Sequence, residues 1–146
     1  MKTHYTVGFL FNQDKSKVAL IRKNRPVWQF NRLNGIGGHV EEDEESSVCM
    51  SREFHEEARY PLEISPEWKR YASLDSPTFF VDCFAAIGDL NQIRSKTSEK
   101  IEIIEIISIH PNRKVDMIEN LPWLISMAID FLEDGRPFFA TIKYEQ

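Results

Sequence analysis

GGHVEEDEESSVCMSREFHEEARY, residues 37–60, is the stretch that decides the fold. It begins with paired glycines, which mark backbone that turns sharply or lets another group approach closely. From Glu44 to Ala58 it contains neither glycine nor proline, so a helix is predicted there, with Asp43 as its N-cap and Pro61 beyond its end. The two glutamates after Asp43 would lie in the first turn, where the helix dipole favours negative charge. A glycine-rich turn therefore leads directly into an acidic helix.

Strands are predicted on both sides of this stretch. Thr6–Phe11 and Lys17–Lys23 are apolar and separated by a polar turn, which predicts a hairpin with a longer loop. Residues 24–33 form a loop in this prediction. Further strands are expected at 68–75, 79–88, 101–110 and 137–145, and a second helix at 120–135, with Pro122 at its start, Gly135 at its end and an apolar stripe of Leu124, Met127, Ala128 and Phe131. Strands dominate and two helices cover them, so the fold class is α+β, an α/β/α sandwich with a mixed sheet.

Composition excludes several classes of protein. The length of 146 residues suits one domain spanning 1–146. A net charge of −5 argues against a nucleic-acid partner, because acidic surfaces repel phosphate backbones. No apolar run reaches about 18 residues and no cleavable leader follows the start, so neither a membrane span nor a signal peptide is expected. Cys49 and Cys83 have no metal-ligand spacing and are expected to be reduced thiols in a cytoplasmic protein.

Three glutamates of the predicted helix lie on one face. Glu53, Glu56 and Glu57 are spaced i, i+3 and i+4, which brings their side chains together. Packing three carboxylates costs energy through repulsion, and either Arg52 or a hard divalent cation such as Mg²⁺ could offset it. The alternative is that the acidic run is a solvated helix face, which is the commoner role of such runs.

The spacing of these residues resembles the signature of the Nudix hydrolases. That signature is Gly, five residues, Glu, seven residues, then Arg-Glu, an apolar residue, any residue, Glu-Glu, any residue, Gly and an apolar residue. Here Gly38, Glu44, Arg52-Glu53, Glu56-Glu57 and the apolar Phe54 and Tyr60 stand at those positions. Two positions depart: Arg59 replaces the last glycine, and Ile36 stands where many members have proline. Because a left-handed turn is costly for arginine, the helix is expected to continue to Tyr60 and stop at Pro61.

The resemblance implies a mechanism and roles for the residues of the box. Glu53, Glu56 and Glu57 would bind Mg²⁺, with Mn²⁺ as the alternative ion, and one of them, Glu53 in the first instance, would accept the proton of the attacking water. Arg52 would orient the glutamates, and Glu44 would pair with Arg52 in a structural role. The carbonyl of Gly37 or Gly38 would complete the metal shell.

Residues outside the box supply further candidates for the site. A second base is expected from Glu99, Glu102 or Glu105, although Glu102 and Glu105 equally suit exposed positions of a half-buried strand. The base of a nucleotide would be bound by aromatic and amide side chains, for which plain core packing, or capping for the asparagine, is the competing role: Trp28, Gln29, Phe80, Asn120 and Trp123. His39 and His55 flank the box and are expected to be surface or loop residues, since Mg²⁺ prefers oxygen.

The function implied is a Mg²⁺-dependent pyrophosphohydrolase that cleaves a nucleoside diphosphate linked to another group. Residues 24–44 and 120–130 look like segments of bacterial and phage members of the oxidised-nucleotide type, which suggests a (d)NTP or oxidised dNTP giving NMP and pyrophosphate. Rival substrates are ADP-ribose, NADH, dinucleoside polyphosphates and capped RNA. The alternative class is a non-catalytic nucleotide-sensing domain, which the complete set of box residues disfavours. A homodimer is left open.

Overall fold

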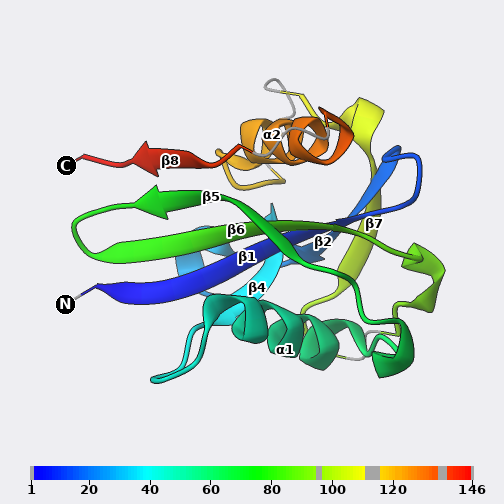
Figure 1. Cartoon of the computed structure of the whole chain (residues 1–146), viewed down its shortest axis with the longest axis horizontal. Helices are drawn as coiled ribbons and strands as arrows, with labels where there is room; N and C mark the ends of the chain where they lie inside the picture. Colours follow the sequence, from blue (N-terminus) through cyan, green and yellow to red (C-terminus); the bar gives the residue numbers. More distant parts are fainter. Residues whose placement is uncertain (1, 95–96, 111–115, 135–137, 146) are drawn as a thin grey trace.

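The centre of the structure is one eight-stranded sheet with a helix on each face (Figure 1). The structure is a computed structural model and describes residues 2–94, 97–110, 116–134 and 138–145. Helix α1 (Ser46–Ala58) covers one face and α2 (Leu121–Asp134) the other. The strands are β1 (Thr3–Phe11), β2 (Lys17–Arg22), β3 (Leu33–Asn34), β4 (Ile36–His39), β5 (Lys69–Asp75), β6 (Phe79–Ile87), β7 (Ile101–Glu105) and β8 (Ala140–Lys143). The predicted α/β/α sandwich is confirmed.

The sheet is mixed, as predicted. Its strand order is β3-β2-β1-β6-β5-β8, with β4 paired to β1 and β7 paired to β2. β1 runs parallel to β6, and β5 runs parallel to β8, while the remaining pairs are antiparallel. The predicted hairpin of the first two strands is present, with Leu10 opposite Ala19. Strand β1 therefore has neighbours β2, β4 and β6 and lies at the centre of the fold.

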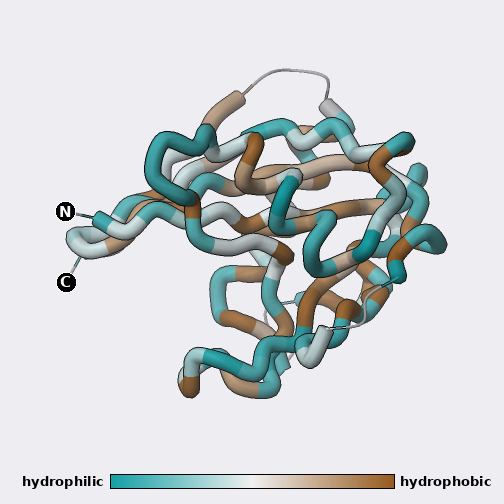
Figure 2. Tube along the Cα trace, turned by 90° about the horizontal axis from the view of Figure 1, so that it is seen from below, coloured by the Kyte–Doolittle hydropathy of each residue, from teal (hydrophilic) through white to brown (hydrophobic). Residues whose placement is uncertain are grey.

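Two apolar layers hold the helices against the sheet. Alternation along β1 directs Phe9 and Phe11 to the α2 side and Leu10 to the α1 side. On the α2 side the buried Tyr71 donates a hydrogen bond of 2.8 Å to the carbonyl of Leu124 and so ties β5 to α2. The predicted apolar stripe of α2 lies in this layer. Figure 2, seen from the α1 side, shows that hydrophilic and hydrophobic residues alternate at short intervals along the chain.

The α1 layer fixes the helix that carries the candidate site. Met50 and Phe54 are fully buried, and Phe54 contacts the rings of Tyr60 and Trp68 at 5.2 and 5.3 Å between centroids. These side chains anchor the apolar face of α1 on the sheet, so its acidic face has one fixed direction. Replacing Phe54 with alanine would remove the largest of these anchors, at a cost of about 3–5 kcal/mol.

Several predicted boundaries differ from those in the structure. The predicted loop at 24–33 contains a 3-10 turn, Val27–Gln29, and ends in β3. The strand expected over 101–110 ends at Glu105 and continues as a 3-10 turn, Ile106–Ser108. Gly135, predicted to end the second helix, and Pro137, predicted to begin the last strand, lie outside the described residues. Within the described part of the chain, neither helix has the length and apolar character needed to cross a membrane.

Candidate active site

The approach to α1 differs from the prediction. The helix begins at Ser46, and its N-cap is Glu45, which makes no side-chain capping bond. Asp43 is not the N-cap but adopts a left-handed φ of 64°, a conformation that aspartate tolerates better than most residues. Glu44 also lies before the helix, and its carboxylate accepts a 3.0 Å hydrogen bond from the backbone N–H of Glu41. The turn at 41–44 is therefore closed twice, by this bond and by a 3.1 Å bond from the Glu44 N–H to the Glu41 carbonyl, and the side-chain bond competes with helix formation at Glu44.

Arg52 is the centre of charge in the site. Its guanidinium donates to both carboxylate oxygens of Glu44, at 2.8 and 3.0 Å, in a bidentate pair. The same group lies 3.1 Å from Glu53, 3.5 Å from Glu56 and 3.8 Å from Glu41. The hydrogen bonds from Arg52 and from the Glu41 N–H lower the pKa of Glu44 to about 2. The single guanidinium of Arg52 thus lies within 4.0 Å of four carboxylates, which leaves the site with excess negative charge.

Glu53 is far less exposed than Glu56, its neighbour in the predicted metal set. Its side chain is 16% exposed, and burial raises its pKa despite the neighbouring guanidinium. The backbone of Gly38 lies against it so closely that a Cβ at that position would be only 2.4 Å from the carboxyl carbon. Glycine at position 38 therefore leaves room for the Glu53 carboxylate in its present position.

The glycine-rich stretch before α1 is a strand and not a sharp turn. Residues 36–39 form β4, antiparallel to β1, with Gly37 opposite Val7 and Gly38 opposite Thr6. Gly35, Gly37 and Gly38 have no left-handed φ, so close approach is what these positions demand. A Cβ on Gly37 would lie 2.0 Å from the carbonyl oxygen of Thr6. Of the two roles that the sequence allowed, the close approach is confirmed and the sharp turn is wrong.

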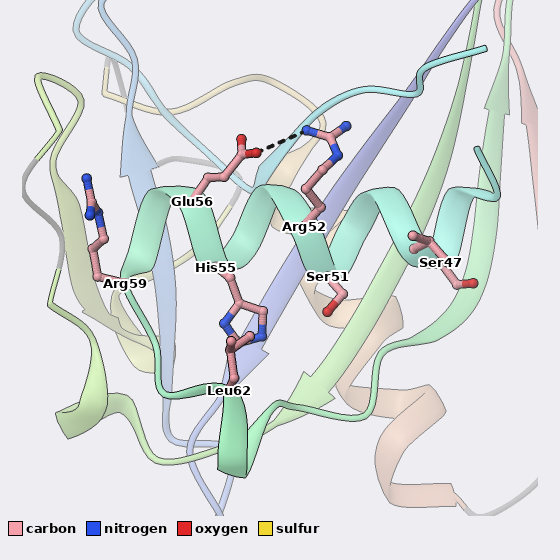
Figure 3. Close-up of a pocket in the computed structure, with 8 residues that line it drawn as sticks. Ser47, Ser51, Arg52, His55, Glu56, Arg59 and Leu62 are labelled. Atoms are coloured by element: carbon pink, nitrogen blue, oxygen red, sulfur yellow. Dashed lines mark hydrogen bonds and ion pairs between the residues drawn. The ribbon is translucent and has the colours of Figure 1, made fainter. Parts of the chain in front are cut away.

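Glu56 and Glu57 lie on the more open part of the helix. The Glu56 side chain is 57% exposed and points to the same side of α1 as Arg52, while Ser51 and His55 point to the opposite side (Figure 3). Glu57 is half-buried, and one of its carboxylate oxygens accepts a 3.2 Å hydrogen bond from the Thr97 hydroxyl. A shallow surface groove of about 820 Å³ includes Arg52 and Glu56, and the outer turns of α1 with Leu62 line the rest of it.

The donor chemistry of this face fits a hard divalent cation. Glu53, Glu56 and Glu57 offer carboxylate oxygens, the ligands that Mg²⁺ prefers, and Arg52 already places positive charge between the first two. Across the described ranges, no three His, Cys, Asp or Glu side chains converge closely enough to form a metal cluster as they stand. Gly38, whose backbone lies against the Glu53 carboxylate, has a carbonyl that accepts a 3.5 Å hydrogen bond from the Thr6 hydroxyl.

The end of α1 also differs from the prediction. The helix stops at Ala58, and Arg59 adopts the left-handed conformation, with φ 54° and ψ 37°. Its N–H bonds to the carbonyl of His55, as in a helix that ends on glycine. The expected extension to Tyr60 is therefore wrong, because the buried Tyr60 and the following Pro61 require the turn at position 59. Arg59 therefore adopts the left-handed turn that a glycine would provide at this position.

The predicted base-binding residues are spread over the molecule. Trp28 is 63% exposed, and Gln29 accepts a 3.1 Å bond from Asn34, both near β3. Phe80 is partly buried on β6 and packs edge-on against His4. Asn120 and Trp123 belong to the start of α2 on the opposite face of the sheet from α1, and Asn120 donates to the Tyr144 hydroxyl at 3.0 Å.

The three carboxylates considered as a further base differ in their surroundings. Glu102 forms a two-bond ion pair with Arg22 of β2. Glu99 is paired with Lys23 at 3.1 Å. Glu105 is exposed at the end of β7. Two of the three are therefore neutralised by partners on or next to β2.

The two histidines beside the box are engaged with protein groups. The ring nitrogens of His55 contact the Tyr60 carbonyl at 2.9 Å and the Ser65 hydroxyl at 2.8 Å. The His39 ring packs edge-on against the Tyr5 ring. The backbone carbonyl of His39 accepts a 3.3 Å hydrogen bond from the Arg52 guanidinium. Sequence reasoning missed Thr97 as a neighbour of Glu57, since nothing in a single sequence links two positions so far apart in the chain.

Comparison with known proteins defines the class of this site. A family model described as the NUDIX domain matches residues 2–117, most of the chain, so the protein belongs to the NUDIX family. It is therefore a hydrolase of pyrophosphate bonds in nucleoside diphosphate-linked compounds. Nudix hydrolases generally use a divalent metal. None of the curated proteins matches the sequence.

Solved structures agree on the fold at low sequence identity. A MutT structure from work on Aliivibrio salmonicida and Vibrio cholerae has 21% identity and a TM-score of 0.69, and the alignment covers 90% of this chain and 100% of that one. A mutator MutT protein from Bacillus halodurans has 16% identity and a TM-score of 0.69, covering 98% and 90%. An ADP-ribose pyrophosphatase from Streptococcus suis has 14% identity and a TM-score of 0.69, covering 97% and 99%. These likenesses establish the fold alone.

Proposed function

We propose that the protein is a Mg²⁺-dependent pyrophosphohydrolase that cleaves a (d)NTP or an oxidised dNTP to NMP and pyrophosphate. The observation that carries the proposal is the excess charge around Arg52, where one guanidinium faces four carboxylates. Such a site gains stability from a bound divalent cation. The resemblance of residues 24–44 and 120–130 to members of the oxidised-nucleotide type favours a nucleoside triphosphate. The structures of similar fold include MutT proteins and an ADP-ribose pyrophosphatase, so the fold suits either substrate.

In this proposal Glu53, Glu56 and Glu57 hold the cation, with the Gly38 or Gly37 carbonyl as a further ligand. The ion supplies neutralisation of phosphate charge and polarisation of the bridging oxygens. Glu53 accepts the proton of the attacking water, a role that suits a carboxylate whose pKa is raised by burial. Arg52 fixes the carboxylate of Glu53 at 3.1 Å, and Glu44 fixes Arg52.

Base recognition in this proposal uses side chains outside α1. Trp28 offers an exposed indole for stacking, and Gln29 and Asn120 offer amide groups. Phe80 is half-buried and Trp123 is exposed, and both would add apolar contact. We further propose that residues 1–146 act as one domain in the cytoplasm, and a homodimer is an open alternative to the monomer.

The test is a panel of nucleotides with Mg²⁺, with products separated and identified. The panel contains dGTP, an oxidised dGTP, ADP-ribose, NADH and a dinucleoside polyphosphate. We expect NMP and pyrophosphate from a triphosphate, and loss of turnover of at least about 100-fold in Glu57→Gln. The control is Glu133→Gln, which changes an exposed carboxylate of α2.

Two outcomes would contradict the proposal. Turnover of ADP-ribose or a dinucleotide with no turnover of triphosphates would reassign the substrate. Tight nucleotide binding without hydrolysis by the unchanged protein would support a sensing domain.

A further inference from the structure

Residues 24–31, called here the aromatic turn, form a turn that exposes large apolar side chains. Val27, Trp28 and Phe30 are 92%, 63% and 64% exposed. The backbone is nevertheless closed by internal bonds, from Gln29 N–H to Pro26 at 2.9 Å and from Phe30 N–H to Val27 at 3.1 Å. Contiguous exposed apolar side chains on a defined backbone mark a contact surface.

The aromatic turn is held at both ends by charged side chains. At its start, Glu99 accepts from the Asn24 backbone N–H at 2.7 Å and from the Lys23 ammonium at 3.1 Å. At its end, the Arg22 guanidinium donates to the Asn31 carbonyl at 3.0 Å, and Glu102 holds that guanidinium. Two of the three carboxylates considered as a further base, Glu99 and Glu102, therefore fix this turn.

Glu99 also connects the aromatic turn to α1. The Thr97 hydroxyl lies 2.7 Å from the Glu99 carbonyl and 3.2 Å from the carboxylate of Glu57. The Asn24 side chain adds a 3.1 Å bond to Ser98 in the same segment. Residues 97–99 thus touch the acidic face of α1 on one side and the aromatic turn on the other.

We propose that Glu99 is a positioning residue that sets the aromatic turn, and with it Trp28, relative to the metal-binding face of α1. Its side chain is 12% exposed, and each carboxylate oxygen already accepts a bond from the turn. A catalytic base needs a lone pair within reach of the attacking water, and this carboxylate directs its oxygens toward Lys23 and Asn24. This inference rests on the proposed function, since the turn would bind the nucleotide that α1 cleaves.

Two substitutions separate positioning from base catalysis. Glu99→Ala removes both bonds, so the aromatic turn loosens and KM for the nucleotide rises about tenfold, with kcat within about threefold of the unchanged protein. Glu99→Gln keeps an oxygen that can accept from Asn24, so KM stays within about threefold. A fall in kcat of about 100-fold or more in both variants would overturn the proposal, because a base or metal ligand is not replaced by an amide.

Hydrogen exchange of the backbone amides provides a measurement that needs no substrate. In Glu99→Ala the amides of Asn24 and Asn31 are expected to exchange at least about tenfold faster, while Glu99→Gln and the control Glu133→Ala match the unchanged protein. Unchanged exchange in Glu99→Ala would overturn the positioning role. If the unchanged protein hydrolyses no nucleotide, the proposed function fails, and the exchange data still decide whether Glu99 orders the turn.

Discussion

Two acidic regions of this molecule use the same residue type in opposite ways. On α1 and the turn before it, four carboxylates surround the single guanidinium of Arg52. Beside β2, Glu99 pairs with Lys23 and Glu102 pairs with Arg22. Burial raises the pKa of Glu53, whereas at Glu99 the bonds from Asn24 and Lys23 outweigh burial and lower the pKa.

The difference separates carboxylates that need a further cation from carboxylates that are already neutralised. The first kind can bind a metal ion and act in chemistry, since part of their charge is unmatched. The second kind fixes backbone in place, because a paired and hydrogen-bonded carboxylate resists displacement. Contacts, and not residue type, therefore distinguish the two regions.

The largest expected effect is the difference in activity between two variants that each remove one carboxylate charge, one from each region. Glu53→Gln is expected to lower kcat about 10²–10⁴-fold, because it removes both a metal ligand and the proposed base. Glu102→Gln keeps a hydrogen-bond acceptor for Arg22 and should change kcat/KM by less than about tenfold. Steady-state kinetics on the preferred nucleotide would measure both, and equal losses would remove the distinction between the regions.

The adjacent glycines of β4 sharpen the description of the α1 region. Gly37→Ala puts a Cβ against the backbone of Thr6 and should destabilise the protein by about 1–3 kcal/mol. Gly38→Ala meets only the Glu53 carboxylate, a flexible group, so stability should change by less than about 1 kcal/mol while kcat falls by up to about 100-fold. Urea unfolding and kinetics would separate the two effects. Loss of stability in both variants would show that Gly38 serves packing alone.

The Glu44–Arg52 pair beside α1 predicts that the free energy of unfolding depends on pH. The pKa of Glu44 is lowered from 4.5 to about 2 in the folded protein, chiefly by hydrogen bonds from Arg52. The pair therefore stabilises the fold fully above pH 4.5, and this contribution is lost as the pH falls toward 2. The free energy of unfolding of Glu44→Gln should approach that of the unchanged protein over this range. A difference that does not vary with pH would contradict the ion pair.

The smallest effect is expected at the end of α1. Arg59→Gly should stabilise the protein by about 1 kcal/mol, because glycine adopts the left-handed conformation without strain. Arg59→Ala keeps the Cβ and is the matched control, for which no gain is expected. Thermal unfolding would detect the difference, and a gain in the alanine variant would point to the arginine side chain instead of the backbone.

Sequence reasoning found the parts of the fold that local patterns determine. The absence of glycine and proline from 44–58 predicted α1, and the apolar stripe around Leu124 predicted α2. The order of strands and helices predicted the sandwich, and the spacing from Gly38 to Glu57 predicted the acidic face of α1. It failed where a distant partner decides the conformation. Residues 36–39 form a strand because β1 lies beside them, although glycines alone suggested a turn.

A distant partner also explains the roles found around β7, whereas the errors at the two ends of α1 come from local turns. The left-handed Asp43 lies in a turn that a backbone bond and a side-chain bond between Glu41 and Glu44 close, and the left-handed Arg59 precedes the buried Tyr60. The roles of Glu99 and Glu102 depend on Lys23 and Arg22, which the fold brings across from β2. Such pairings have no local signal in a single sequence.

The central place of β1 has a consequence for folding kinetics. Its parallel partner β6 lies far along the chain, with Thr3 beside Phe79, and no hairpin can join them. The chain between β1 and β6 must close on itself before the middle of the sheet forms. The entropy of this closure is lost before the hydrogen bonds between the two strands stabilise the sheet. We therefore expect folding in the range of milliseconds to seconds, with the pairing of β1 and β6 as part of the slow step.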